Sequence, residues 1–301
     1  MRAAFHLHPK QASAILRAMG KTLLSLGHGY SASGLETRLL ARGWQIIGTT
    51  RSDDKARAMQ ARGVTPLIWP GNPLPLDQAT HLLTSIAPRG ADPVLAAHGD
   101  EIAEARHLEW VGYLSTIGVY GDRQGGWVDE TDTPDARSER ARDRIAAENA
   151  WQAVCDRAGV ALHVCRLAGI YGPGRGPFAK LRAGRAQRVI KPGQVFSRIH
   201  LDDIAEALDL AMHSDLGSRI FNLCDDLPAP PQDVLCHAAD LMGISPPPEV
   251  PFEEADLSPM ARAFYADSKR VRNDRIKRDL GLTLRHPDYR SGLAAIRAAE
   301  G

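Results

Sequence analysis

Short apolar runs alternate with longer segments of helical spacing over the first two thirds of the chain. The runs predicted as strands are 22–26, 44–50, 64–69, 81–86, 110–115, 161–167 and 219–223. Segments 34–41, 55–62 and 136–157 carry apolar residues at the spacing of helices with one buried face. Strands and helices that alternate in this way form parallel sheets covered on both sides. The pattern predicts an α/β fold: a Rossmann-type doubly wound parallel sheet with a smaller C-terminal α/β substrate-binding region.

The regular alternation ends near residue 170. Glycine and proline cluster in 169–177, a further strand–helix unit is expected at 197–212, and residues 227–259 are rich in proline. A basic helix at 268–280 and an amphipathic helix at 291–300 complete the predicted elements. We therefore divide the chain into an N-terminal extension (1–21), a dinucleotide-binding core (22–170) and a mainly substrate-binding region (171–301). Strands and helices near 197–223 are expected to return to the core.

A glycine pattern lies between the first predicted strand and the first predicted helix. The segment Gly27–Ala32, GHGYSA, fits G-x-G-x-x-A. Gly27 permits a tight turn, Gly29 lets the backbone approach a pyrophosphate, and Ala32 allows close helix–strand packing. The N–H groups at the start of the helix, from Tyr30 and Ser31 onward, favour phosphate. The loop predicts dinucleotide binding, and a plain strand–helix turn is the alternative.

The end of the second predicted strand bears on the choice of cofactor. It reads Thr50, Arg51, Ser52, where an acidic residue would hydrogen-bond the ribose 2′-hydroxyl of NAD. An arginine instead favours a 2′-phosphate. We predict that NADP is preferred over NAD, and an exposed loop arginine without such a role is the alternative.

Composition and charge exclude several classes of function. The chain has 37 basic and 36 acidic residues and a net charge of +1, so no global field favours nucleic acid or an anionic membrane. No apolar run approaches the roughly 20 residues of a membrane span, and the N-terminus does not resemble a signal peptide. The four cysteines lack metal-ligand spacing, and we expect reduced thiols, no metal and a cytoplasmic protein.

Five segments resemble, in the same order, motifs of one known superfamily. They are 113–121 (YLSTIGVYG), 129–134 (DETDTP), 166–174 (RLAGIYGPG), 199–205 (IHLDDIA) and 221–223 (FNL). These motifs are similar to those of the extended short-chain dehydrogenase/reductases, which include NAD-dependent epimerases and dehydratases. Residues 269–273 (KRVRN) resemble an element of a small atypical branch. The chain is identified as an atypical member of this superfamily.

The resemblance implies a set of site residues. Contacts to the cofactor are expected at Ser85, Ile86, Ala87, Leu114, Arg144, Leu167, Gly169 and Ile170. Catalytic candidates are Ser115, Thr116, Tyr120 and Arg144. Substrate is expected to meet Arg140, Tyr171, Arg175 and His200, which favour an anionic ligand such as a phosphorylated sugar. The superfamily's habit also implies a homodimer through helices near 100–107 and 137–157.

One departure from the superfamily's pattern affects the chemistry. Active members carry a Tyr-x-x-x-Lys pair on the long helix, where the tyrosine transfers a proton. Here Arg140 and Arg144 occupy those positions, and arginine stays protonated at neutral pH. Three alternatives follow. Tyr120 or Tyr171 supplies the proton, the arginines position an anionic substrate for different chemistry, or the protein binds dinucleotide without turnover.

The predicted function is therefore an NAD(P)-dependent oxidoreductase or epimerase acting on a small polar, sugar-like substrate. The alternative is a catalytically impaired NAD(P)-binding sensor or scaffold protein. His200 lies next to Asp202 and Asp203, and we expect one of these aspartates to cap the following helix while His200 lines the cleft. A metal or charge-relay role of this group is the alternative.

Overall fold

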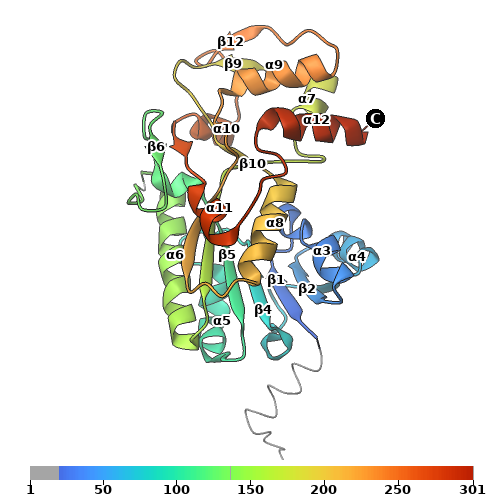
Figure 1. Ribbon diagram of the computed structural model, residues 1–301, viewed down its shortest axis with the longest axis vertical. Coiled ribbons are helices and arrows are strands. Elements are labelled where there is room, and N and C mark those ends of the chain that lie inside the picture. The colour runs from blue at the N-terminus through green and yellow to red at the C-terminus, as the bar shows by residue number, and fades with distance from the viewer. Residues whose placement is uncertain (1–19, 136, 301) are drawn as a thin grey trace, which may run out of the picture. The chain divides into compact units, whose positions relative to one another are not determined.

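The computed structural model describes residues 20–135 and 137–300 of the chain (Figure 1). Most of the N-terminal extension predicted at 1–21 therefore lies outside the described residues. Contacts between Cα atoms divide the chain into two units, which we describe separately. The first contains the described residues up to Leu114, with Ala147–His163 and Asp215–Arg219. The second contains Ser115–Ala146, Val164–Ser214 and the chain from Ile220 onward. The predicted division into a core and a substrate-binding region stays a prediction.

A seven-stranded sheet organises the chain, in the order β11-β7-β5-β4-β1-β2-β3. Its strands are β1 (Thr22–Leu26), β2 (Gln45–Thr50), β3 (Thr65–Ile68), β4 (His81–Thr84), β5 (Trp110–Thr116), β7 (Leu162–Leu167) and β11 (Arg219–Leu223). β1 pairs in parallel with both β2 and β4, β2 with β3, and β4 with β5 (Figure 1). The chain thus runs outward from β1 to β3 and then returns to β4 on the other side. This is the doubly wound Rossmann order, so the predicted fold class is confirmed.

The helices of the first half include those predicted at 34–41, 55–62 and 136–157. They are α2 (Tyr30–Ser33), α3 (Glu36–Ala41), α4 (Asp53–Ala61), α5 (Pro93–Glu104) and α6 (Glu139–Ala158). Trp151 of α6 is fully buried, and its indole N–H donates to Asp92 Oδ2 at 3.0 Å. The other carboxylate oxygen of Asp92 accepts the N–H groups of Val94 and Leu95 and so caps α5. One carboxylate therefore joins two helices of the first unit.

The second unit adds short parallel strand pairs and further helices. The pairs are β8 (Gly169–Tyr171) with β10 (Arg198–His200), β9 (Arg188–Ile190) with β12 (Glu249–Pro251), and β6 (Trp127–Val128) with β13 (Arg270–Val271). The helices are α7 (Phe178–Arg182), α8 (Leu201–Met212), α9 (Pro231–Leu241), α10 (Pro259–Phe264), α11 (Asp274–Leu280) and α12 (Tyr289–Glu300). Phe178, Ala238, Leu293 and Ile296 form part of one apolar core that joins α7, α9 and α12.

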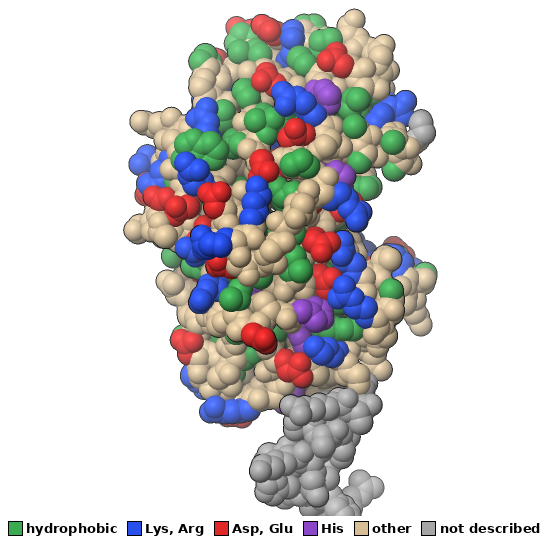
Figure 2. All heavy atoms as spheres, viewed as in Figure 1, with side chains coloured by type: hydrophobic (Ala, Val, Ile, Leu, Met, Phe, Trp, Pro, Cys, Tyr) green, Lys and Arg blue, Asp and Glu red, His purple; other side chains and the backbone are tan. Residues whose placement is uncertain are grey.

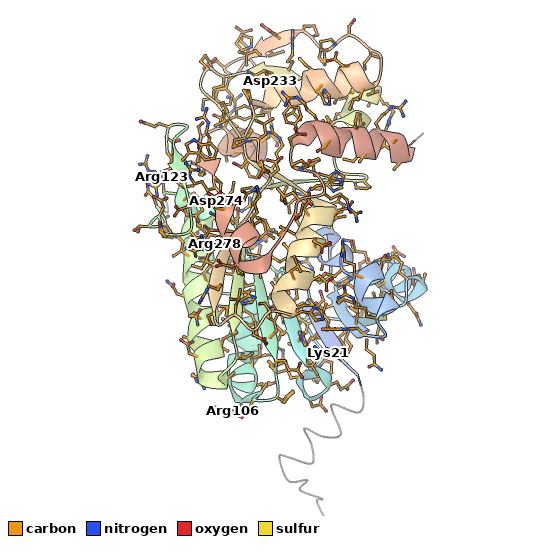
Figure 3. The ribbon with its side chains drawn as sticks, viewed as in Figure 1. Lys21, Arg106, Arg123, Asp233, Asp274 and Arg278 are labelled. Atoms are coloured by element: carbon orange, nitrogen blue, oxygen red, sulfur yellow. The ribbon has the colours of Figure 1, made fainter. Side chains whose placement is uncertain are left out.

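One prediction for this unit is wrong, and one helix was not predicted. The proline-rich residues 227–259 contain α9, which begins at Pro231 and runs for 11 residues. A proline in the first turn is compatible with a helix, since that N–H has no partner within the helix. The helix predicted at 268–280 is half as long. It begins at Asp274, with Arg278 in its last turn (Figure 3), and β13 occupies part of the preceding stretch.

The surface agrees with the balanced composition. On the face shown in Figure 2, basic and acidic side chains are interspersed, and neither sign forms a continuous field. Within residues 20–135 and 137–300, we find no helix with both the length and the apolar character that a membrane span requires.

Candidate functional site

The predicted phosphate loop follows β1 and has the geometry that its glycines allow. Gly27 has a φ of +73°, a backbone region that residues with a side chain rarely adopt. A Cβ atom at Gly27 would lie 2.7 Å from Ile86 Cγ1 and 3.1 Å from Ser85 Oγ. Gly29 is exposed and extended, and it directly precedes α2. Ala32 is buried on the inner side of α2. The loop therefore needs a glycine at position 27 and presents bare backbone to the surface at position 29.

Neighbouring strands hold this loop in place. The Gly27 N–H donates to Thr49 Oγ1 at 2.7 Å, and the His28 N–H donates to the Thr49 carbonyl at 3.0 Å. The Ser85 hydroxyl, just after β4, donates to the Gly27 carbonyl. Because β1, β2 and β4 are parallel, their carboxyl ends meet at one edge of the sheet. The loop lies where the strand order reverses, which is where Rossmann-type proteins bind dinucleotides.

A buried side-chain network also holds the loop. His28 Nε2 lies 2.9 Å from Glu36 Oε1, and Arg62 donates to both carboxylate oxygens of Glu36, from Nε at 2.7 Å and from Nη2 at 2.9 Å. Burial lowers the pKa of His28, although the Glu36 carboxylate opposes this effect. Burial alone would raise the pKa of Glu36, but hydrogen bonds from Arg62 and His28 lower it overall. A neutral His28 thus donates to an ionised Glu36, and no sequence pattern indicated this contact.

The guanidinium of Arg51, just after β2, is accessible. Ser52 caps α4, since its Oγ accepts the Lys55 N–H at 3.4 Å, and Thr50 Oγ1 accepts the Ser52 N–H at 3.3 Å. Arg51 is exposed, and it makes no hydrogen bond or ion pair with the residues that the structure describes. Its guanidinium is therefore available to an anionic ligand at the edge of the first unit.

The other predicted cofactor contacts lie within strands or just after them. They are Ser85, Ile86 and Ala87 after β4, Leu114 in β5, Leu167 in β7, and Gly169 and Ile170 in β8. The first four belong to the first unit and the last three to the second. Their contact with a cofactor stays a prediction.

Four of the five motif segments meet in one buried cluster of the second unit. The Tyr120 hydroxyl donates to Asn222 Oδ1 at 2.8 Å, and the Asn222 N–H donates to Glu130 Oε1 at 2.8 Å. The Arg166 guanidinium lies 4.9 Å from the centre of the Tyr120 ring. Burial raises the pKa of Tyr120, although the Arg166 charge opposes it. Tyr120 has no exposed surface that a substrate could contact. The residues of this motif cluster therefore pack together in the interior of the second unit.

The end of β5 carries the two hydroxyl candidates. Ser115 is buried, and Thr116 is half-buried at the last position of the strand. Thr116 Oγ1 accepts the Gly118 N–H at 3.0 Å. A hydroxyl that accepts one hydrogen bond keeps its own proton for donation. Thr116 is therefore fixed in orientation and can still donate.

The two arginines in place of the Tyr-x-x-x-Lys pair differ in exposure. Arg140 is exposed in the first turn of α6, whereas Arg144, one turn later, is only 9% exposed. A buried guanidinium requires polar or charged neighbours. Arg144 is therefore not a solvated surface residue, and Arg140 is accessible.

A cavity of about 470 Å³ lies within the second unit. Its lining includes Tyr171, Arg175, Lys180, Arg198 and Tyr289. Arg198 Nη1 donates to the carbonyls of Phe196 and Ala229, at 2.8 and 3.0 Å, so its guanidinium is held by main chain. The sequence predicted Tyr171 and Arg175 here and missed Arg198 and Tyr289. Three cations in one cavity favour an anionic ligand.

His200 lies directly behind Tyr171. The two rings are perpendicular, with their centres 5.1 Å apart. His200, not Asp202 or Asp203, caps α8, because its Nδ1 accepts the Asp202 N–H at 3.2 Å. Asp203 instead accepts the N–H groups of Arg285 and His286, at 2.6 and 3.1 Å. The predicted aspartate cap is thus wrong, because this carboxylate faces a segment more than 80 residues away in the chain.

Comparisons with known proteins agree with this fold. No family model matches the chain. A functionally unknown conserved protein from Silicibacter pomeroyi is 55% identical, with a TM-score of 0.87 over 93% of this chain and 99% of that one. Protein YeeZ of Escherichia coli K12 is 26% identical over 291 residues, covering 89% of this chain and 97% of YeeZ. MoeE5, solved with UDP-glucose and NAD, is 23% identical with a TM-score of 0.72, over 93% of this chain and 98% of MoeE5.

The doubly wound sheet, the glycine loop and these similarities define the class of fold, which is the Rossmann-type α/β fold. This fold agrees with the resemblance of the motifs to those of the extended short-chain dehydrogenase/reductases. The chain belongs to the same family as the conserved protein from Silicibacter pomeroyi.

Proposed function

We propose that the protein is an NAD(P)-dependent oxidoreductase or epimerase that acts on a small polar substrate carrying an anionic group. The observation that carries the proposal is the loop Gly27–Ala32. Its first glycine is required by both φ and space, and it lies at the carboxyl edge of the sheet where the strand order reverses. Helix starts in this position favour phosphate through main-chain N–H groups.

The residues of the loop fit a dinucleotide. The space beside Gly27 is too narrow for a Cβ, and Gly29 is exposed, so a diphosphate can approach bare backbone there. Residues Gly29–Ala32 would hold the diphosphate, and Arg51 would hold a 2′-phosphate. A nicotinamide cofactor supplies hydride transfer when bound. The accessible, unpaired Arg51 supports a preference for NADP over NAD.

A titration of the two reduced cofactors tests the cofactor assignment. Charged hydrogen bonds contribute about 1.5–3 kcal/mol, so we expect Arg51→Ala to weaken NADPH binding by about 10- to 100-fold and to leave NADH binding nearly unchanged. Arg57→Ala is the matched control, because Arg57 is also exposed, in the middle of α4, but pairs with Asp54. Equal losses for the two cofactors, or NADH binding more tightly than NADPH to the unchanged protein, would contradict the preference.

The cavity of the second unit supports an anionic substrate. Arg175, Lys180 and Arg198 supply positive charge, and Tyr171 supplies a ring wall. This combination suits a phosphate or carboxylate attached to a polar body such as a sugar. Sugar nucleotides are the first substrates to test, since the structural neighbour MoeE5 was solved with UDP-glucose.

Polarisation of the substrate carbonyl is assigned to the end of β5, and Tyr120 is given no part in it. Thr116 keeps a hydroxyl proton that can polarise a substrate carbonyl, whereas the Tyr120 hydroxyl is committed to Asn222. Removing one such donor costs about 100- to 1,000-fold in kcat in comparable sites. We expect Thr116→Ala to lower turnover by this order and Thr116→Ser to retain most of it. Cofactor affinity of both variants should match the unchanged protein.

A second candidate function rests on the absence of tyrosine at position 140. A dinucleotide-binding sensor would keep the loop and the cavity but would transfer no hydride. The two candidates are separated by following reduced-nicotinamide absorbance with pooled sugar nucleotides, aldehydes and ketones. Turnover that requires Thr116 supports the enzyme, and cofactor binding without turnover over the whole panel supports the sensor.

A further inference from the structure

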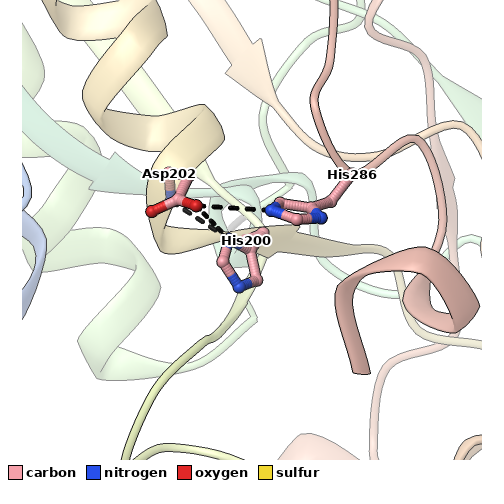
Figure 4. A group of neighbouring side chains, drawn as sticks. All are labelled: His200, Asp202 and His286. Carbon is pink, nitrogen blue, oxygen red and sulfur yellow. Dashed lines mark hydrogen bonds and ion pairs between the residues drawn. The ribbon is translucent and has the colours of Figure 1, made fainter. Parts of the chain in front are cut away.

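Three metal-ligating side chains meet at the start of α8 (Figure 4). His200 is the last residue of β10, Asp202 lies in the first turn of α8, and His286 comes from the segment before α12. One ligand atom from each residue lies within 4.8 Å of the other two. All three residues belong to the second unit, and none of them is used in the proposed function's hydride chemistry.

The distances between the ligand atoms match a small coordination sphere. Asp202 Oδ2 lies 3.3 Å from His286 Nε2 and 3.7 Å from His200 Nδ1. Zinc bonds to histidine nitrogen or carboxylate oxygen are about 2.0–2.1 Å long, so two ligands at a tetrahedral ion are about 3.3–3.4 Å apart. Both distances to Asp202 therefore lie within a few tenths of an ångström of this spacing, and the two histidine nitrogens lie within 4.8 Å of each other.

The protonation states also suit a metal. His200 Nδ1 accepts the Asp202 N–H at 3.2 Å, so this nitrogen carries a lone pair and Nε2 carries the proton. Coordination through Nδ1 would replace that hydrogen bond, which contributes only about 0.5–1.5 kcal/mol. His286 and Asp202 share one hydrogen bond, and in such pairs a cation can take the place of the shared proton.

Charges of both signs surround the cluster. The positive end of α8 opposes a cation by about 0.3–1 kcal/mol, and the exposed Arg285 guanidinium lies 3.7 Å from Asp202 Oδ2. The Asp202 and Asp203 carboxylates oppose both effects. Arg285 is 66% exposed, so its side chain can leave the cluster at little cost.

We propose that His200, Asp202 and His286 form a binding site for a divalent transition metal ion of the zinc type. Two imidazoles and one carboxylate select such an ion over magnesium or calcium, which prefer all-oxygen sites. The two histidine side chains are only 3% and 7% exposed, whereas Asp202 is 42% exposed. The fourth position of the ion would therefore open on the Asp202 side, to water or a ligand atom. The ion would join the first turn of α8 to the segment before α12.

Cobalt and zinc titrations of the tag-free full-length chain test the site. We expect one tightly bound ion per chain, with the visible absorption of cobalt in a tetrahedral nitrogen–oxygen environment. Changes outside the ligand sphere cost about 10- to 100-fold in metal affinity, so loss of a ligand in His286→Ala should cost at least about 100-fold. Asp202→Asn keeps a hydrogen-bonding oxygen but loses the charge, and it should also weaken metal binding. This variant tests the site if His286→Ala fails to fold.

The matched control lies at the other end of the same helix. His213 Nδ1 is 3.3 Å from Asp209 Oδ1, which gives a histidine–aspartate pair without a third ligand among the described residues. His213→Ala should leave cobalt affinity and spectrum unchanged. Metal binding that persists in both site variants would place the ion elsewhere and overturn the proposal. Absence of a tightly bound ion in the unchanged, folded protein would overturn it as well. Neither result depends on nicotinamide binding.

Discussion

Replacing Gly27 by alanine should damage the phosphate loop in two separate ways. The backbone φ of +73° disfavours any side chain by roughly 1–2 kcal/mol. The new Cβ would also lie 2.7 Å from Ile86 Cγ1 and 3.1 Å from Ser85 Oγ, and forcing atoms into such a packed site costs about 1–3 kcal/mol. The expected loss of unfolding free energy for Gly27→Ala is therefore about 2–5 kcal/mol.

Gly43 offers a control that separates the two costs. Its φ of +76° is almost the same, but a Cβ atom there meets nothing within 4 Å. Gly43→Ala should thus lose only the conformational part, roughly 1–2 kcal/mol. Both positions belong to the first unit, so urea unfolding of the two variants compares like with like.

The assay is urea unfolding followed by far-ultraviolet circular dichroism, together with NADPH titration. Gly27→Ala should be the less stable variant and should also lose NADPH binding, because relief of the contact with Ile86 moves the loop. Gly43→Ala should bind NADPH like the unchanged protein. If the two variants lose equal stability and both bind NADPH normally, the close approach at Gly27 has no energetic role and the reasoning fails.

Two further changes test buried polar groups. Trp151→Phe removes the indole N–H that donates to Asp92 and should cost about 1.5–3 kcal/mol of unfolding free energy. The ring of Trp127 is 49% exposed, so Trp127→Phe should cost clearly less. Similar losses in the two variants would refute the role of this bond. Burial raises the pKa of Asp225 to about 8, so the folded chain keeps a proton that the unfolded chain releases above about pH 4. Ionisation then destabilises the folded state as pH rises, and Asp225→Asn should gain urea resistance over the unchanged protein between about pH 4 and 8. Stability curves that stay parallel over this range would contradict the assignment.

The sheet and the phosphate loop could be predicted because their signals are local. Each buried parallel strand appears as a short apolar run, since helices cover both faces. The predicted run 22–26 coincides with β1, and 219–223 coincides with β11. The glycine pattern was informative because a strand and a helix flank it, and this setting is visible within 30 residues of sequence.

Elements held by distant partners could not be predicted in the same way. β13 is held by main-chain bonds to the β6 region, where the Arg270 N–H donates to the Gly126 carbonyl and the Arg272 N–H to the Val128 carbonyl. Basic residues in this stretch are compatible with a helix, and only the partner strand decides the outcome. The motif 269–273 is explained by the same pairing. Part of this motif is thus a strand that joins two segments of the second unit.

The candidate sites divide along the same line. Tyr171 and Arg175 flank a recognisable glycine–proline turn, so one local sequence pattern indicates both residues. His286 comes 84 residues after Asp202, and no spacing rule connects the two. Arg198 adjoins the predicted segment 199–205, but only the cavity that it lines identifies it as a candidate ligand-binding residue. Sequence patterns thus do not predict the site residues that come singly from segments far apart in the chain.

The segment 285–292 links the proposed metal site to the cavity. Its main-chain N–H groups at 285 and 286 are fixed by Asp203, and the carbonyl of Asp288 accepts the Tyr171 hydroxyl at 3.2 Å. A Cβ at Gly292 would collide with the Tyr171 ring, so the α12 backbone packs directly against it. Tyr171 therefore touches this segment on one side and the His200 ring on the other.

This arrangement gives the two proposed ligands a common physical element. An ion bound through His286 would restrain the segment at one end, and an anion in the cavity would restrain it at Tyr289, which lines the wall. Restraint imposed by the first ligand lowers the ordering cost of the second, so the two affinities should rise together. Thermodynamic linkage makes the effect equal in both directions. A structural zinc and a substrate anion would then be coupled through backbone order, without any direct contact between them.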